Sequence, residues 1–254
     1  MGFVLACLIC LAPAINAQDA PRELVVFAAS SLTDAFIEIG AAFEAENPGV
    51  RVLFSFGSSS DLAVQLTQGA PADVFASANI KQMQAAAQGG VPRAFAFNRL
   101  ALIVPVDNPA AIHGVEDLDL PGVALVVAAT GVPIRAYTDA LIGKMVADPA
   151  HGAAYQAGVQ ANIVSEEQNV RLIAAKVALG EADAGIVYFS DVTPDIADAV
   201  QVFSIPPALD ALAIYPIVAS HTSAQPDWAA AFVDFVLSEP GQATLARWNF
   251  IRAR

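Results

Sequence analysis

Residues 23–34 read ELVVFAASSLTD and residues 50–61 read VRVLFSFGSSSD, and in both stretches a serine-rich turn follows an apolar segment. The segment 23–29 is rich in β-branched and aromatic residues, and the segment 50–56 has Val or Phe at every second position, so both are expected to be strands. Each turn is expected to open a helix. Two strand–turn–helix units in succession predict a βαβ sheet whose serine turns lie at one edge.

The patterns in the rest of the chain predict an α/β fold with two lobes. The first lobe is expected to combine residues 18–99 with residues 216–254, and the second to span residues 100–215. Each lobe should be a mixed sheet flanked by helices, and the two chain crossings between them should form a hinge beside a cleft. Small ligands favour such clefts and the carboxyl ends of strands. Further strands are expected at 73–78, 100–104, 122–129, 162–164, 184–188, 200–205 and 212–219, and further helices at 81–88, 134–146, 169–179, 228–237 and 242–248.

The first 17 residues, MGFVLACLICLAPAINA, are typical of a secretory signal peptide cleaved before Gln18, although they lack a basic residue. Both cysteines, Cys7 and Cys10, lie in this segment, so the mature chain is expected to have neither disulfides nor thiolate metal sites. A lipid anchor at Cys7 is the weaker interpretation, because the apolar stretch before it is short. No later run is apolar for long enough to predict a membrane-spanning helix.

The chain is acidic, with a formal net charge of −13 and only 15% charged residues. Nucleic-acid binding is disfavoured, because there is no basic stripe to neutralise phosphates. An acidic surface also repels small anions at long range. Any anion site must therefore attract its ligand locally, through backbone and hydroxyl dipoles.

The serine turns are candidates for such a site. A helix N-terminus presents unpaired N–H groups and the positive end of the helix dipole, so it can hold an oxyanion without a Lys or Arg. Ser31 and Ser59 would each add a hydroxyl donor. Each serine could instead only cap its own helix, and Ser31 and Asp34 are spaced like a capping box.

The second lobe offers matching groups. Pro133 suits the first turn of a helix, which would direct the N–H groups of Ile134 and Arg135 toward the cleft. Another helix start is expected in the segment 165–171, where Ser165 and Gln168 have capping-box spacing.

Three further side chains in the second lobe bear on the site. Tyr188 ends an expected strand with a hydroxyl, although such an aromatic side chain often belongs to the core. Arg135 and Arg171 could balance the charge of an anion, or could lie on solvated faces.

Taken together, these segments resemble the periplasmic molybdate-binding proteins of ABC importers. The resemblance implies a type II periplasmic-binding fold, a membrane permease as partner and no cofactor. It implies that molybdate or tungstate is held by the two serines, two backbone N–H groups and the tyrosine, with no direct metal–ligand bonds. A monomer is expected. The chain departs from the family pattern after its Val-Pro pair, where Ile134-Arg135 replaces the usual small residues. The matching segments are 26–33 (VFAASSLT), 56–62 (FGSSSDL), 69–78 (GAPADVFASA), 98–108 (NRLALIVPVDN), 132–137 (VPIRAY), 169–171 (NVR) and 185–191 (GIVYFSD), and the implied ligand residues are Ser31, Ser59, Ile134, Val170 and Tyr188.

The choice of anion remains open at this stage. Molybdate and sulfate carry no proton near neutral pH and only accept hydrogen bonds, whereas phosphate keeps a proton that needs an acceptor, which Asp61 could supply. The alternative ligands are therefore sulfate and phosphate. A serine hydrolase is the remote alternative, because His113, His151 and His221 lie in no recognisable motif and the serine turns are not nucleophile elbows. We therefore expect a binding protein and no catalytic residues.

Overall fold

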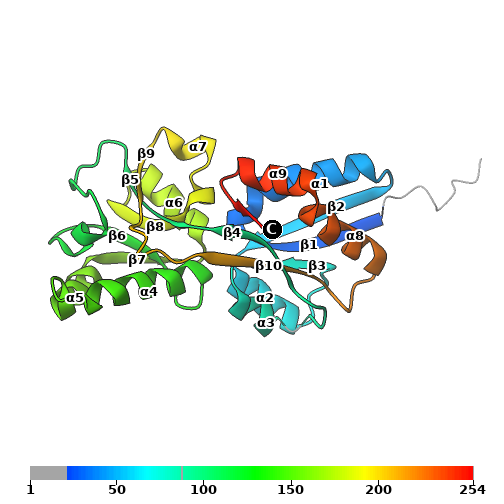
Figure 1. Cartoon of the computed structure of the whole chain (residues 1–254), viewed down its shortest axis with the longest axis horizontal. Coiled ribbons are helices and arrows are strands. Elements are labelled where there is room, and N and C mark those ends of the chain that lie inside the picture. Colours follow the sequence, from blue (N-terminus) through cyan, green and yellow to red (C-terminus); the bar gives the residue numbers. More distant parts are fainter. Residues whose placement is uncertain (1–21, 87, 254) are drawn as a thin grey trace, which may run out of the picture.

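The computed structural model describes residues 22–86 and 88–253, and within them the chain forms two α/β lobes side by side (Figure 1). The expected fold class is confirmed. The expected signal peptide, residues 1–17, lies outside the described residues. Within the described part of the chain, no helix is both long enough and apolar enough to cross a membrane.

Lobe 1 is built on a six-stranded sheet with the strand order β11-β4-β10-β3-β1-β2. Its strands β1, β2 and β3 are parallel, as the two strand–turn–helix units predict, while β10 runs antiparallel to β3 and β4. The strands are β1 (Arg22–Ala29), β2 (Val50–Gly57), β3 (Val74–Ala76), β4 (Arg93–Asn98), β10 (Ala213–Ala219) and β11 (Ile251–Arg252).

Helices cover both faces of this sheet (Figure 1). On one face, Phe36 of α1 packs against Phe95 and Phe232, with ring centroids 5.7 and 6.2 Å away, and the three rings lie fully buried in the core. The helices on this face are α1 (Thr33–Glu46), α8 (Pro226–Leu237) and α9 (Glu239–Arg247), and those on the other face are α2 (Ser59–Thr67) and α3 (Ile80–Ala85).

Lobe 2 is built on a five-stranded sheet with the order β7-β6-β8-β5-β9. Strand β6 is parallel to β7 and β8, and β5 is antiparallel to β8 and β9. The strands are β5 (Leu100–Pro105), β6 (Leu125–Ala128), β7 (Ile163–Glu167), β8 (Ala184–Tyr188) and β9 (Val200–Ser204), and the helices are α4 (Pro133–Ala147), α5 (Gly152–Asn162), α6 (Val170–Ala178) and the short α7 (Pro194–Ala197).

The chain crosses between the lobes twice. Arg99 alone separates β4 of the first sheet from β5 of the second, and residues 205–212 lead from β9 back to β10. Strand β10 joins the first sheet from Ala213, ahead of the boundary expected at residue 216. The two crossings lie side by side in the middle of Figure 1, where a hinge would be.

Two local expectations are wrong. Ser165 lies inside β7, and α6 is capped instead by Asn169, whose side-chain oxygen accepts from two N–H groups of the first turn. The segment Glu239-Pro240-Gly241 does not separate two helices but forms the first turn of α9, where a proline costs no helical hydrogen bond.

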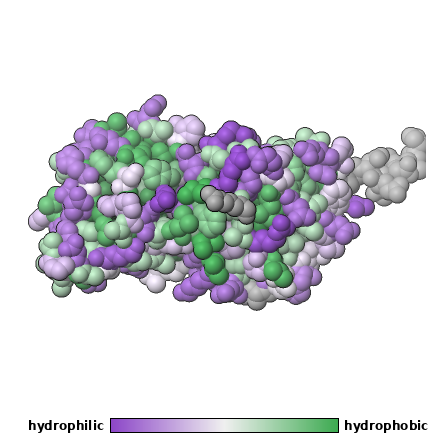
Figure 2. Space-filling model, viewed as in Figure 1, coloured by the Kyte–Doolittle hydropathy of each residue, from purple (hydrophilic) through white to green (hydrophobic). Residues whose placement is uncertain are grey.

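The surface is mixed in polarity. In Figure 2, hydrophilic residues are spread over the visible face of both lobes, with hydrophobic residues interspersed among them.

Candidate functional site

A small cavity lies between the lobes, at the carboxyl ends of β1 and β2. Lobe 1 lines it with residues 29–31, residues 57–59 and Ala78, and lobe 2 with residues 132–134, Val170 and Tyr188. All five residues singled out from the sequence are among them. The cavity is small, with a volume of about 10 Å³, which favours a small and compact ligand.

The hydroxyl groups of Ser31 and Ser59 are anchored from the protein side. Ser31 lies in the 3₁₀ helix η1 (Ser30–Leu32), and its Oγ is 2.9 Å from the hydroxyl oxygen of Tyr215. The Oγ of Ser59 accepts a hydrogen bond from the N–H of Ala78 at 2.9 Å. Both serines are at most 2% exposed. Because Ser59 already accepts from the backbone, its own hydrogen remains available to donate.

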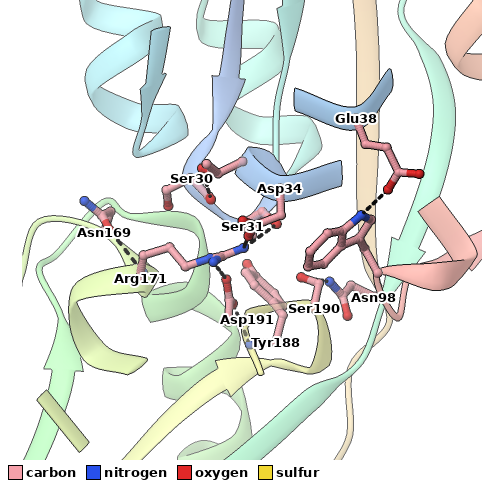
Figure 3. Close-up of polar contacts among 12 residues, drawn as sticks. Ser30, Ser31, Asp34, Glu38, Asn98, Asn169, Arg171, Tyr188, Ser190 and Asp191 are labelled. Atoms are coloured by element: carbon pink, nitrogen blue, oxygen red, sulfur yellow. Dashed lines mark hydrogen bonds and ion pairs between the residues drawn. The ribbon is translucent and has the colours of Figure 1, made fainter. Parts of the chain in front are cut away.

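Neither serine caps a helix. The cap of α2 is Ser58, whose Oγ accepts from the N–H of Asp61 at 3.2 Å, and α1 has no side-chain cap. The capping-box interpretation of Ser31 with Asp34 is therefore wrong. Asp34 turns instead toward lobe 2 (Figure 3).

Lobe 2 directs backbone N–H groups toward the cavity from the starts of α4 and α6. In α4, Pro133 has no N–H and the N–H of Arg135 bonds to the carbonyl of Val132 at 3.0 Å, which leaves Ile134 as the free donor of the first turn. In α6, the Oδ1 of Asn169 accepts from the N–H groups of the second and third residues. The N–H of Val170 precedes both of these and stays free for a ligand.

The hydroxyl of Tyr188 completes the lining. Tyr188 ends β8 with 1% exposure, and its hydroxyl has no hydrogen-bond partner among the described residues. Burial raises the pKa of Tyr188 well above its ordinary value, so the group stays protonated and able to donate. Buried polar groups are rarely left unpaired, so this hydroxyl points to a ligand that accepts hydrogen bonds.

The lining includes no charged side chain. Arg135 pairs with Asp139 and Glu166, each at 2.8 Å, and lies outside the cavity wall. Asp61, considered as an acceptor for a protonated ligand, is exposed and also lies outside the wall. The cavity therefore meets a ligand with hydroxyl and N–H dipoles rather than with charges.

A buried ion pair supports the wall behind Tyr188. The carboxylate of Asp191 accepts from the N–H of Tyr188 at 3.1 Å and from the Nε of Arg171 at 2.8 Å (Figure 3). Burial raises the pKa of Asp191 to about 6, and the charge of Arg171 opposes that rise. Arg171 does not line the cavity, and its partly buried side chain pairs with the carboxylates of Asp34 and Asp191.

Sequence reasoning missed two supporting residues, Tyr215 and Asp191. Tyr215 lies in an expected strand, where its aromatic ring carries no signal of a polar role. Asp191 follows Tyr188 by three residues, but only the 3₁₀ turn Phe189–Asp191 brings its carboxylate back to the strand end.

Two α/β lobes enclose the cavity, and the chain crosses between them twice. This arrangement defines a solute-binding protein. Residues 24–251 match the family of bacterial extracellular solute-binding proteins, and the chain belongs to that family. The molybdate-binding protein ModA of Mycobacterium tuberculosis is 39% identical over 244 residues, which cover 94% of this chain and 88% of the relative.

Two solved structures share the fold. The periplasmic molybdate-binding protein of Azotobacter vinelandii aligns with a TM-score of 0.75 at 21% identity, covering 91% of this chain and 100% of that one. The sulfate-binding protein SubI of Mycobacterium tuberculosis aligns with the same TM-score of 0.75 at 20% identity, covering 91% and 87%. Proteins that bind different oxyanions thus share this fold, so the choice of anion depends on the residues that line the cavity.

Proposed function

We propose that this protein captures molybdate, or the similar tungstate, in the cavity between its lobes and delivers it to the membrane permease of an ABC importer. The observation that carries the proposal is a cavity lined by hydroxyl groups, backbone N–H groups and apolar groups, with no charged side chain. Its lining includes the buried hydroxyl of Tyr188, which has no hydrogen-bond partner among the described residues. The 39% identity to a molybdate-binding protein over nearly the whole chain supports the same ligand.

The donor set favours an anion that carries no proton. Ser59 and Tyr188 offer hydroxyl hydrogens, Ser31 offers one when its oxygen accepts from Tyr215, and Ile134 and Val170 offer N–H groups. Hydrogen phosphate would bring a hydrogen that meets no carboxylate in this wall, so a serine hydroxyl would have to accept it; left unpaired, that hydrogen would cost about 1–3 kcal/mol. Molybdate, tungstate and sulfate avoid that cost.

We place this activity outside the cytoplasmic membrane. A signal peptide over residues 1–17 would deliver the chain to the periplasm without a lipid anchor. There the protein would act as a monomer, because the two lobes of one chain supply the whole lining of the cavity.

A thermal-shift panel with molybdate, tungstate, sulfate, phosphate and chromate tests the proposal. A ligand present at a hundred times its Kd stabilises the folded state by about 2.7 kcal/mol, which should raise the Tm by roughly 5–10 °C. Molybdate and tungstate should give the largest shifts. A shift with phosphate alone would refute the assignment, and a larger shift with sulfate than with molybdate would make this a sulfate-binding protein.

A further inference from the structure

An ion pair joins the two lobes beside the cavity. Arg171 belongs to α6 of lobe 2, and its Nη2 lies 2.7 Å from the Oδ2 of Asp34 in α1 of lobe 1 (Figure 3). The same nitrogen lies 3.5 Å from the carbonyl oxygen of Ser31, while the Nε is held by Asp191 within lobe 2. Asp191 thereby fixes the guanidinium in the position from which it reaches lobe 1.

The pair ties together the elements that supply the ligand donors. Arg171 directly follows Val170, whose N–H faces the cavity, and Asp34 lies in the first turn of α1, directly after the 3₁₀ helix that carries Ser31. Neither side chain lines the cavity. Their contact therefore acts on lobe closure rather than on the ligand itself.

A second, uncharged contact joins the lobes elsewhere around the cavity. The Nε2 of Gln82, in α3 of lobe 1, donates to the carbonyl oxygen of Gly131 at 3.0 Å, just before α4 of lobe 2. In Figure 1, α3 and α4 lie below the two sheets, whereas α1 and α6 lie above them. The lobes are thus held on both sides of the cavity, by the charged pair on one side and by the neutral hydrogen bond of Gln82 on the other.

We propose that Asp34 and Arg171 form a clasp that holds the lobes closed over the bound anion and sets how long it stays. This inference rests on the proposed function. The serines that would hold the anion are at most 2% exposed, so the anion leaves only after the lobes part. Parting the lobes breaks the Asp34–Arg171 pair, so the strength of the pair controls the release rate. Arg171 and Asp34 are positioning residues.

The direction in which a substitution of Asp34 changes anion binding distinguishes the clasp from a simple effect of charge. Asp34→Asn removes a negative charge close to the anion site, and by charge alone this should strengthen anion binding. Loss of the clasp should weaken it, because a charge-assisted hydrogen bond across the cleft is lost. The two explanations therefore predict opposite changes for one substitution.

The chain offers a matched control on the same helix. Glu38 lies one turn after Asp34 in α1 and also pairs with an arginine, but its partners, Arg247 and Trp248, belong to lobe 1. Glu38→Gln removes the same charge from the same helix and breaks an ion pair without touching the contact between the lobes.

The experiment is stopped-flow measurement of sodium molybdate association and dissociation for the mature wild-type chain and both variants. Asp34→Asn should dissociate on the order of tenfold faster, with little change in the association rate, while Glu38→Gln should match the wild type. A dissociation rate in Asp34→Asn that is unchanged or slower would overturn the clasp. Equal acceleration in both variants would overturn it too, because the effect would then come from the helix or its charge.

A double-mutant cycle shows whether Asp34 acts through Arg171. In an Arg171→Gln background, adding Asp34→Asn should not accelerate release further, and an additive effect would contradict the pairing. Should Arg171→Gln not fold because Asp191 loses its partner, the comparison of Asp34→Asn with Glu38→Gln decides alone. A wild-type chain that binds no molybdate would refute the proposed function, whereas molybdate binding with no kinetic change in Asp34→Asn would refute only the clasp.

Discussion

The two lobes supply their hydrogen-bond donors in different ways. Lobe 1 offers side-chain hydroxyls, Ser31 and Ser59, each held by a partner within the same lobe. Lobe 2 offers mainly backbone N–H groups at the starts of α4 and α6, with the hydroxyl of Tyr188 between them. In the proposed site, the contribution of lobe 1 therefore depends on residue identity, whereas that of lobe 2 depends on where two helices begin.

This difference explains how lobe 2 can carry Ile134-Arg135 where small residues are usual. A backbone donor survives a change of side chain. The side chain of Ile134 is buried, with 1% exposure, and that of Arg135 turns to Asp139 and Glu166 outside the cavity. The departure thus changes the packing around the helix start and keeps the N–H group in place.

The strongest test of this difference between the lobes is to remove a backbone donor of lobe 2 while keeping its helix. Val170→Pro does so, because Asn169 before it is extended, with φ −158° and ψ 167°, and proline is favoured at the first helical position. Calorimetric affinity for molybdate should fall on the order of a hundredfold, through the lost hydrogen bond and the ring placed toward the anion. Val170→Ala, which keeps the N–H, is the control, and an equal loss in both would show that the side chain matters instead.

The next largest effect should come from the hydroxyls of lobe 1. Ser31→Ala and Ser59→Ala should each weaken molybdate binding by roughly tenfold or more without unfolding the protein, because each removes one donor to the anion. Ser58→Ala should lower the Tm, because Ser58 caps α2. Unchanged affinity in both serine variants would remove these side chains from the site.

The smallest effect is expected for the hydroxyl of lobe 2. Tyr188→Phe removes a donor, but it also removes the cost of burying a hydroxyl that has no partner among the described residues. The two terms partly cancel, so affinity for molybdate should fall by only roughly threefold in the same titration. A loss greater than that in Ser31→Ala or Ser59→Ala would reverse the ranking and make Tyr188 the main side-chain donor.

Much of the architecture could be predicted from local patterns. The alternation in β2 and the apolar run in β1 are local signals, and they lie where the structure places these strands. Helix α5 was missed because its sequence, GAAYQAGVQAN, is rich in alanine and glycine and shows little periodicity. Its large buried side chain, Tyr155, bonds to the carbonyl of Val115, a contact far away in the sequence.

The candidate site could be predicted only in part. The serine turns and helix starts were visible, but Ser58 and Ser59 are adjacent residues of one type, and only the fold assigns the cap to the first and the cavity to the second. The pairing of Asp34 with Arg171 joins residues in different lobes, and short-range spacing suggested a helix cap instead. Contacts between the lobes carry no local signature, so the clasp could not be predicted from the sequence.

The hydroxyl of Tyr188, which has no partner among the described residues, has a consequence for the proposed delivery of the anion to a permease. Closure without a bound anion would leave that hydroxyl unsatisfied in a dry environment, at a cost of about 1–3 kcal/mol, which lowers the fraction of unloaded protein that closes by roughly 5- to 160-fold. A permease that binds only the closed form would then bind few molecules of this protein that lack an anion. Tyr188 would in this way help to prevent transport cycles in which no anion is bound.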